Sequence, residues 1–106
     1  MKQKTSIENK KADNEILIGE KPLINYIRSA IIQLKKENKN EIILKARGKF
    51  ITKAVDIAEI TRKKSLAKEN LNLKNIKIDS KDFTKDSKTT TLSTIEITLS
   101  KPSSSL

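Results

Sequence analysis

The sequence predicts an α+β fold, in which a small two-layer βαβαββ domain has a mixed four-stranded sheet with two helices on one face. Short apolar runs at 16–18 and 42–44 are each followed by a helical pattern, which indicates alternating strands and helices. Two segments with alternating polarity, 76–78 and 95–99, follow without a helix between them. A chain of 106 residues is long enough for one modest core and too short for two domains.

The first strand is predicted at the apolar run Ile16-Leu17-Ile18, which Gly19 closes and which we expect to be buried. Pro22 stands where proline is favoured, at the first position of a helix. The segment 35–38 should end that helix, with two lysines at the negative end of its dipole. The apolar stripe between them has helical spacing and consists of Leu23, Ile27, Ala30, Ile31 and Leu34.

The second strand is predicted at 42–44, with burial on both faces because three apolar residues follow one another. A second helix is predicted over 50–64, with Glu59 placed to pair with Lys63 one turn later. We expect its inward stripe to consist of Ile51, Ala54, Val55, Ala58 and Thr61.

The segments 76–78 and 95–99 are predicted strands with one apolar face each, because apolar and polar residues alternate. The intervening segment 79–91 contains no Gly or Pro and therefore lacks a tight-turn signal. Two alternatives stay open for it: a loose loop, or two extended arms joined by a longer turn.

The polar ends of the chain predict a domain organisation in three parts. Residues 1–14 are predicted to be a disordered basic tail, 15–101 the folded domain, and 102–106 a disordered, Ser-rich C-terminal tail.

The chain is strongly basic, with 23 Lys and Arg against 13 Asp and Glu and a formal net charge of +10. This balance predicts a polyanionic partner, either nucleic acid or an anionic membrane surface. The alternative is a general bias toward lysine, since arginine occurs only three times. Such a bias would not by itself place Arg47 between Lys45 and Lys49.

The absence of Cys and His excludes disulfides and the zinc sites and nucleophiles that those residues form. Asp56 and Glu59 are interpreted as salt-bridge partners rather than as a metal pair, because no other acids cluster in the sequence. No apolar run approaches the roughly 18 residues of a membrane span, and no secretory signal is evident. We therefore expect no enzyme activity, cofactor, small-molecule substrate or membrane partner.

The segment Lys45-Ala46-Arg47-Gly48-Lys49 runs directly into the second predicted helix. Free backbone N–H groups, the positive end of the helix dipole and nearby cations all attract phosphate. Lys49 and Lys53, four residues apart at an N-terminus that favours acids, violate the usual stabilising pattern, which indicates a functional site. The alternative is a strand end whose alternate residues simply face water.

Five motifs occur in a fixed order along the chain: Leu17-Ile18-Gly19-Glu20-Lys21-Pro22, Asn25-Tyr26, Ile43-Leu44-Lys45-Ala46-Arg47-Gly48-Lys49, Lys53-Ala54-Val55-Asp56 and Leu92-Ser93-Thr94-Ile95-Glu96-Ile97. With these motifs the chain resembles the Alba family of archaeal chromatin proteins over roughly residues 15–101. The resemblance implies a fold similar to the C-terminal domain of translation initiation factor three and a homodimer. It also implies binding to double-stranded DNA with little sequence preference, binding to RNA by many members, and a hairpin arm that enters the minor groove.

The resemblance implies most of the candidate nucleic-acid contacts, and the three hairpin lysines match by region only. Gly48 and Lys53 are added as candidates because they lie at the predicted phosphate site. The chain departs from the family at Glu20, where some members carry a modifiable lysine, and at Ser65, where relatives often carry a large apolar residue. The candidates are Lys21, Lys45, Arg47, Gly48, Lys49, Lys53, Arg62, Lys64, Lys81, Lys85 and Lys88.

The predicted function is that of a non-sequence-specific chromatin protein that coats and compacts double-stranded DNA as a dimer, associated with the chromosome in the cytoplasm. The alternatives are an RNA-binding or ribonucleoprotein role and a protein–protein adaptor whose charge only confers solubility. Tyr26 and Phe50 could stack on bases, although Tyr26 lies beside the buried stripe and core packing is favoured. With Phe83 as the only other aromatic residue, a stacking platform has little support from the sequence.

Overall fold

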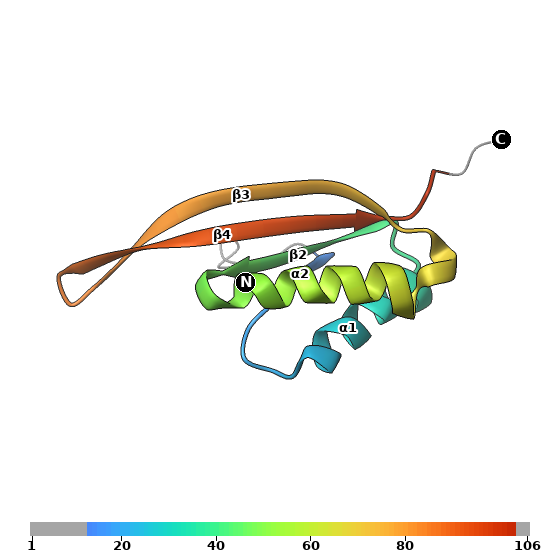
Figure 1. Cartoon of the computed structure of the whole chain (residues 1–106), viewed down its shortest axis with the longest axis horizontal. Coiled ribbons are helices and arrows are strands. Elements are labelled where there is room, and N and C mark those ends of the chain that lie inside the picture. The colour runs from blue at the N-terminus through green and yellow to red at the C-terminus, as the bar shows by residue number, and fades with distance from the viewer. Residues whose placement is uncertain (1–12, 104–106) are drawn as a thin grey trace, which may run out of the picture.

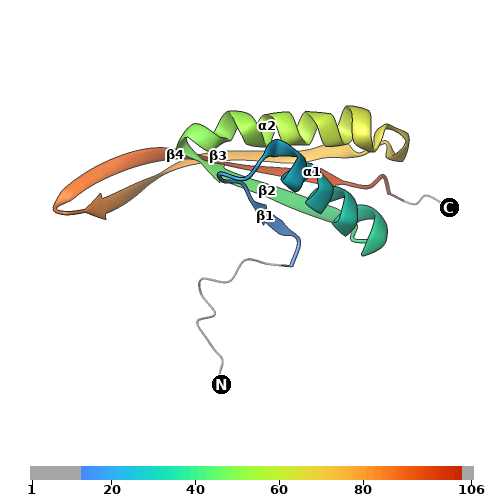
Figure 2. The same cartoon turned by 90° about the horizontal axis from the view of Figure 1, so that it is seen from below.

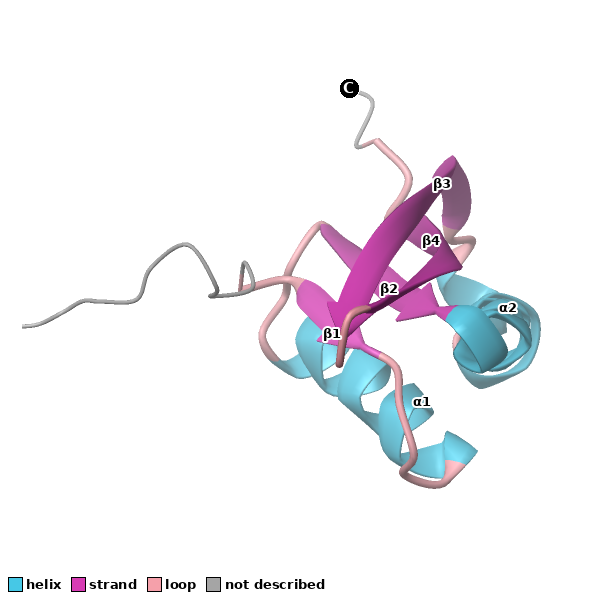
Figure 3. Cartoon of the chain, turned by 90° about the vertical axis from the view of Figure 1, so that its left-hand side faces the viewer, coloured by secondary structure: helices cyan, strands magenta, loops and turns pink. Residues whose placement is uncertain are grey.

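In the computed structural model of the chain, which describes residues 13–103, a mixed four-stranded sheet packs against two helices, as predicted. The strand order is β1-β2-β4-β3, with β1 parallel to β2 and the other neighbours antiparallel. Figure 1 and the end-on view of Figure 3 show both helices on one side of the sheet. The elements are β1 (Glu15–Leu17), α1 (Leu23–Ile31), β2 (Glu41–Arg47), α2 (Ile51–Ile60), β3 (Asn72–Lys85) and β4 (Lys88–Ser100).

Each helix ends in a π-helical turn, at Ile32–Lys36 after α1 and at Thr61–Ser65 after α2. Short 3₁₀ turns precede α2 at Gly48–Phe50 and precede β3 at Ala67–Glu69. Both predicted helices are thus confirmed as continuous helical segments whose last turns are wider than those of an α-helix.

The core lies between the helices and the covered face of the sheet. Ile42 and Leu44 of β2 are fully buried there, opposite Leu99 and Ile97 of β4. The prediction that 42–44 is buried on both faces is wrong, because Ile43 points to the open face and is only half-buried. The same alternation leaves Leu17 of the predicted buried strand 55% exposed.

The inward stripe of α2 differs from the prediction at two positions. Ala54, Ala58 and Thr61 are buried as expected, but Ile57 is fully buried and Val55 is 41% exposed. The helical period places residues 54, 57, 58 and 61 on one face, whereas Val55 lies about 100° further round. The predicted ion pair between Glu59 and Lys63 is confirmed at 3.2 Å.

The segment 79–91 is neither a loose loop nor a pair of arms joined by a long turn. Strands β3 and β4 pair continuously up to Lys85 and Lys88, so the arms are confirmed and the longer turn is wrong. The two-residue turn between them has positive φ at Asp86 (52°) and Ser87 (65°), which Gly and Asn usually supply. The hairpin runs well beyond both helices (Figure 2), and the longest dimension of the molecule is 55 Å.

A clamp of two side chains fixes the β1–α1 loop against both helices. The buried Tyr26 hydroxyl accepts hydrogen bonds from the backbone N–H of Gly19 (3.0 Å) and of Lys21 (3.1 Å). The Lys53 ammonium donates to the carbonyls of the same two residues, at 2.7 and 2.6 Å. Tyr26 therefore packs in the core, as its sequence position favoured, and orders a loop as well.

Replacing Ser87 by Gly should stabilise the protein, because Gly adopts positive φ without the steric cost that Ser carries there. We expect the free energy of unfolding to rise by about 1 kcal/mol in denaturant titrations. Ser93→Gly, the same change at an extended position of β4, is the matched control and should lower it. A destabilised Ser87→Gly variant would contradict the turn geometry.

Tyr26→Phe should loosen the β1–α1 loop, because two backbone N–H groups lose their acceptor. We expect a loss of about 1–3 kcal/mol in stability and faster amide hydrogen exchange at Gly19 and Lys21. The amide of Ile18, which donates to the Lys45 carbonyl at 2.8 Å, provides an internal reference. Unchanged exchange at both loop amides would contradict the clamp.

Candidate nucleic-acid interface

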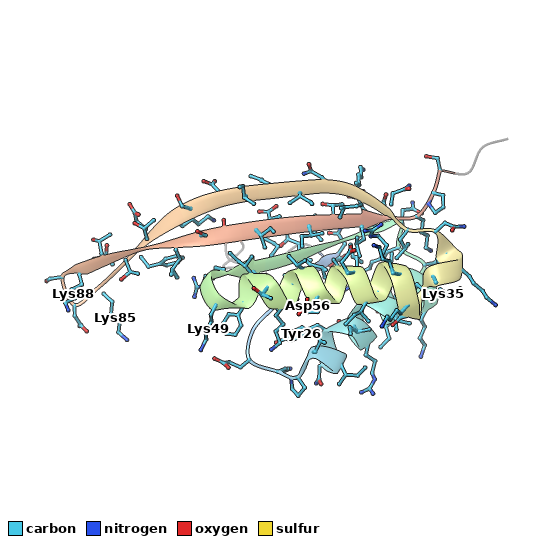
Figure 4. All side chains as sticks on the ribbon, viewed as in Figure 1. Tyr26, Lys35, Lys49, Asp56, Lys85 and Lys88 are labelled. Carbon is cyan, nitrogen blue, oxygen red and sulfur yellow. The ribbon has the colours of Figure 1, made fainter. Side chains whose placement is uncertain are left out.

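Three of the predicted contact residues, Lys21, Arg47 and Lys49, lie at one end of the molecule; we call them the hairpin-end cluster. Arg47 ends β2, Lys49 lies in the turn before α2, and Lys21 lies in the β1–α1 loop. The clamp brings that loop to α2, and Glu20 beside Lys21 contacts the Lys49 ammonium at 3.5 Å. All three cationic side chains are exposed, and Figure 4 shows Lys49 at the end of α2 from which the hairpin projects.

Gly48 links these cations to the backbone at the start of α2. Its φ is +55°, a conformation that glycine adopts without strain. The turn 48–50 and the first turn of α2 have no side-chain cap and no acidic residue. The Ile51 N–H already donates to the Gly48 carbonyl, so the N–H groups that lack an acceptor within the helical segment are those of residues 48–50. These groups and the positive end of the helix dipole add to the field of the cluster. Together these groups can bind an anion such as a phosphate.

Lys53, another candidate, is already engaged within the chain. Its ammonium is bonded to two loop carbonyls in the clamp and lies 5.4 Å from the ring centroid of Tyr26. The side chain is only half-exposed. The structure therefore places Lys53 beneath the hairpin-end cluster, where it holds the loop that carries Lys21.

Lys45 lies on the open face of the sheet between two carboxylates. Its ammonium is 3.5 Å from Glu15 and 3.8 Å from Glu96. Lys77 of β3 also stands opposite Glu96 in register, so opposite charges alternate across β2, β4 and β3, while Glu15 reaches Lys45 from two residues before its register partner Leu17. This row of residues is nearly balanced in charge, and Lys45 contributes less free positive potential than its sequence position indicates.

Arg62 and Lys64 lie at the far end of the second helix from the cluster. Lys64 is fifteen residues after Lys49, about 22 Å along a helix. Arg62 donates from Nε (3.2 Å) and Nη2 (2.7 Å) to one oxygen of Glu59, and this hydrogen bond lowers the pKa of that carboxyl. Lys63 pairs with the other oxygen. Lys64 is exposed, and one chain does not bring it together with the cluster.

The lysines of the hairpin arm share one face, which their spacing in the sequence does not make evident. Strand pairing sets Arg47 opposite Thr94 and Thr94 opposite Asp79, so every second residue of β3 from there shares the face of Arg47. Asp82 points the other way and accepts a hydrogen bond from Thr91 at 2.7 Å. The residues of the hairpin that share the open face with Arg47 include Asp79, Lys81, Phe83, Lys85 and Lys88.

A groove of about 680 Å³ lies on the open face where the hairpin leaves the sheet. Arg47 and Phe83 both line it, with Arg47 Cζ 4.5 Å from the ring centroid of Phe83. Phe50, Lys77 and Lys81 line it as well. Sequence reasoning assigns Phe83 and Lys77 no site. The alternation along 75–85 is a signal that the two share one face of β3, while their position beside Arg47 follows from the pairing of three strands.

In residues 13–103 no group of His, Cys, Asp and Glu could hold a metal ion. Over the same residues, no helix is long and apolar enough to cross a membrane.

The family model described as Alba matches residues 14–80. The "DNA/RNA-binding protein Alba" of Thermoplasma acidophilum is 43% identical over 89 residues, which cover 84% of this chain and 97% of that protein. "DNA/RNA-binding protein Alba 1" of Archaeoglobus fulgidus is 38% identical over 90 residues, covering 85% and 98%. These names are those of binding proteins, in agreement with the prediction that the chain is not an enzyme.

Solved structures also show similarity to Alba proteins. Alba from Thermoplasma volcanium, 42% identical, superposes with a TM-score of 0.76 over 83% of this chain and 100% of that one. ALBA1 from Trypanosoma brucei shares the fold at 17% identity, with a TM-score of 0.67 over 87% of this chain and 72% of that one. The resemblance read from the sequence motifs is confirmed: the chain belongs to the Alba family.

Proposed function

We propose that this protein binds nucleic acid without sequence preference and coats double-stranded DNA as a dimer, associated with the chromosome in the cytoplasm. One observation carries the proposal. The exposed hairpin-end cluster, with uncapped backbone N–H groups between its residues, lies at the root of an arm whose lysines share the face of Arg47. The names of its relatives, which read DNA/RNA-binding protein, agree with it.

The contacts in this proposal are to phosphate. Lys and Arg that neutralise phosphates release bound counterions, and this release supplies affinity independent of sequence. The guanidinium of Arg47 matches two phosphate oxygens at once, while Lys21 and Lys49 act as point charges. Phosphate contacts fix position and carry no sequence information, so the same surface accepts any duplex.

The candidates then divide into two roles. Lys45, Lys53 and Arg62 are bonded to carboxylates or carbonyls and position neighbouring groups more than they bind DNA. Lys64, at the far end of α2, meets the same duplex only if a second subunit extends the surface. Direct phosphate contact falls to Lys21, Arg47, the backbone of Gly48, and Lys49, with Lys81, Lys85 and Lys88 in the hairpin arm.

The second subunit is proposed from an apolar surface on the edge strand β3. Ile76 and Ile78 lie opposite the buried Ile97 and Ile95, so they point to the same side as the core. They are nevertheless 52% and 76% exposed. Exposed apolar side chains gathered on one strand indicate an interaction surface. Two copies that bury it across a two-fold axis would present two hairpin-end clusters and two arms.

Arg47→Ala combined with Lys49→Ala should weaken binding to a duplex of about 30 base pairs by at least roughly tenfold near physiological salt. The salt dependence should also fall by about two phosphate contacts per subunit. Fluorescence anisotropy at several salt concentrations measures both.

The matched control removes the same charge elsewhere, at Lys36 and Lys68, which are exposed and lie outside the cluster. Equal losses from the two double variants would mean that net charge alone governs binding. Glu20→Gln, which removes the carboxylate beside Lys49, should strengthen binding by roughly twofold to fivefold.

Ile76→Thr combined with Ile78→Thr should produce monomers, because the proposed interface loses its apolar side chains while the strand keeps β-branched residues. Sedimentation velocity should give a mass near twice 12.0 kDa for the wild type and near 12.0 kDa for the variant. Lys77→Thr, on the opposite face of the same strand, should stay dimeric. A dimeric double variant would place the interface elsewhere.

A further inference from the structure

The groove on the open face combines features that backbone binding to a duplex does not need. Arg47 stacks on Phe83 at 4.5 Å, and Phe50 lies in the same lining, half-buried and packed against the core. Lys77 and Lys81 add positive charge on the β3 side. Phosphate contacts require cations and N–H groups, whereas a guanidinium on an aromatic ring is a platform for a flat, unsaturated group.

The groove remains open in the proposed dimer. Ile76 and Ile78 point to the covered side of the sheet, whereas Lys77 and Phe83 point to the opposite side, since the strand alternates. A second copy seated on the isoleucines therefore leaves the groove accessible. A paired duplex cannot use it fully, because its bases are stacked inside the helix.

We propose that this groove binds an unpaired RNA nucleotide, with its base stacked on the Arg47–Phe83 pair beside Phe50. Unpaired bases stack on aromatic rings and on guanidinium planes in single-stranded RNA sites. Lys81, on the same face and next to the stack, is placed to take the neighbouring phosphate. This inference rests on the proposed nucleic-acid binding and adds to it a separate site for an unpaired nucleotide.

Two carboxylates in the groove favour RNA over DNA. Asp79 and Glu96 line it among the cations. A carboxylate repels phosphate but accepts a hydrogen bond, and the ribose 2′-hydroxyl that DNA lacks is such a donor. A groove meant only for the phosphate backbone would gain from losing both acids.

The test compares the wild type with Phe83→Leu, which removes the ring and keeps an apolar side chain. Thr84→Leu is the matched control, one residue away on the opposite face of the hairpin. Each protein is titrated by fluorescence anisotropy with a single-stranded RNA and a single-stranded DNA of the same sequence and with a duplex DNA. Thermal melting of each variant confirms that it is folded.

Phe83→Leu should weaken binding to the RNA strand by at least about fivefold and change duplex binding by less than about twofold. The wild type should bind the RNA strand more tightly than the DNA strand, and Thr84→Leu should match the wild type. Equal binding of the two strands, or an RNA affinity that Phe83→Leu leaves unchanged, would overturn the inference. If either result occurs while duplex binding is retained, only the groove inference is rejected and the proposed function stands. If the wild type binds none of the three nucleic acids, the proposed function and the groove inference are both rejected.

Discussion

The helices cover only one face of the sheet, and this constraint determines on which side of the sheet the proposed dimer surface and the proposed RNA groove lie. Because strand residues alternate, every second side chain goes to the core side and the rest go to the open side. On the core side, α1 and α2 bury Ile97 of β4 but leave its register partner Ile76, on the edge strand, half-exposed. On the open side, the same register sets Arg47 level with Asp79, and Phe83, four residues further along β3, shares that face and contacts Arg47. The proposed dimer surface and the proposed RNA groove are thus opposite faces of one sheet, so both can be used at the same time.

The surroundings of each basic residue, rather than the number of cations, decide which of them are available to bind a ligand. The formal charge of +10 is spread along the chain, yet several cations are balanced where they stand. Lys45 lies between two carboxylates, and the Lys53 ammonium is held by two backbone carbonyls. Lys49 is exposed, and its contact with Glu20 is between side chains that are 76% and 80% exposed, where water screens most of the attraction. The hairpin-end cluster therefore keeps most of its positive potential for a ligand.

The sequence predicted what local patterns determine and missed what long-range pairing determines. Apolar periodicity located both helices and all four strands, and the i, i+4 rule located the Glu59–Lys63 pair. Covered and open faces cannot be told apart in a run of three apolar residues, so the exposure of Leu17 was out of reach. The tight turn at 86–87 uses residues that carry no strong turn signal. The contact between Arg47 and Phe83 depends on the register of three strands, and no sequence spacing encodes it.

The central claim is that phosphate neutralisation by exposed cations supplies the affinity, and salt dependence tests it most directly. The measurement is the binding constant for one duplex of about 30 base pairs, determined between about 50 and 200 mM salt. If a dimer neutralises about 6–10 phosphates, log K should fall linearly with log salt, with a total loss of about 10³- to 10⁵-fold. A shallow dependence, corresponding to about one or two phosphates, would contradict the account, because the hairpin-end clusters and arms would then not be bound to the backbone.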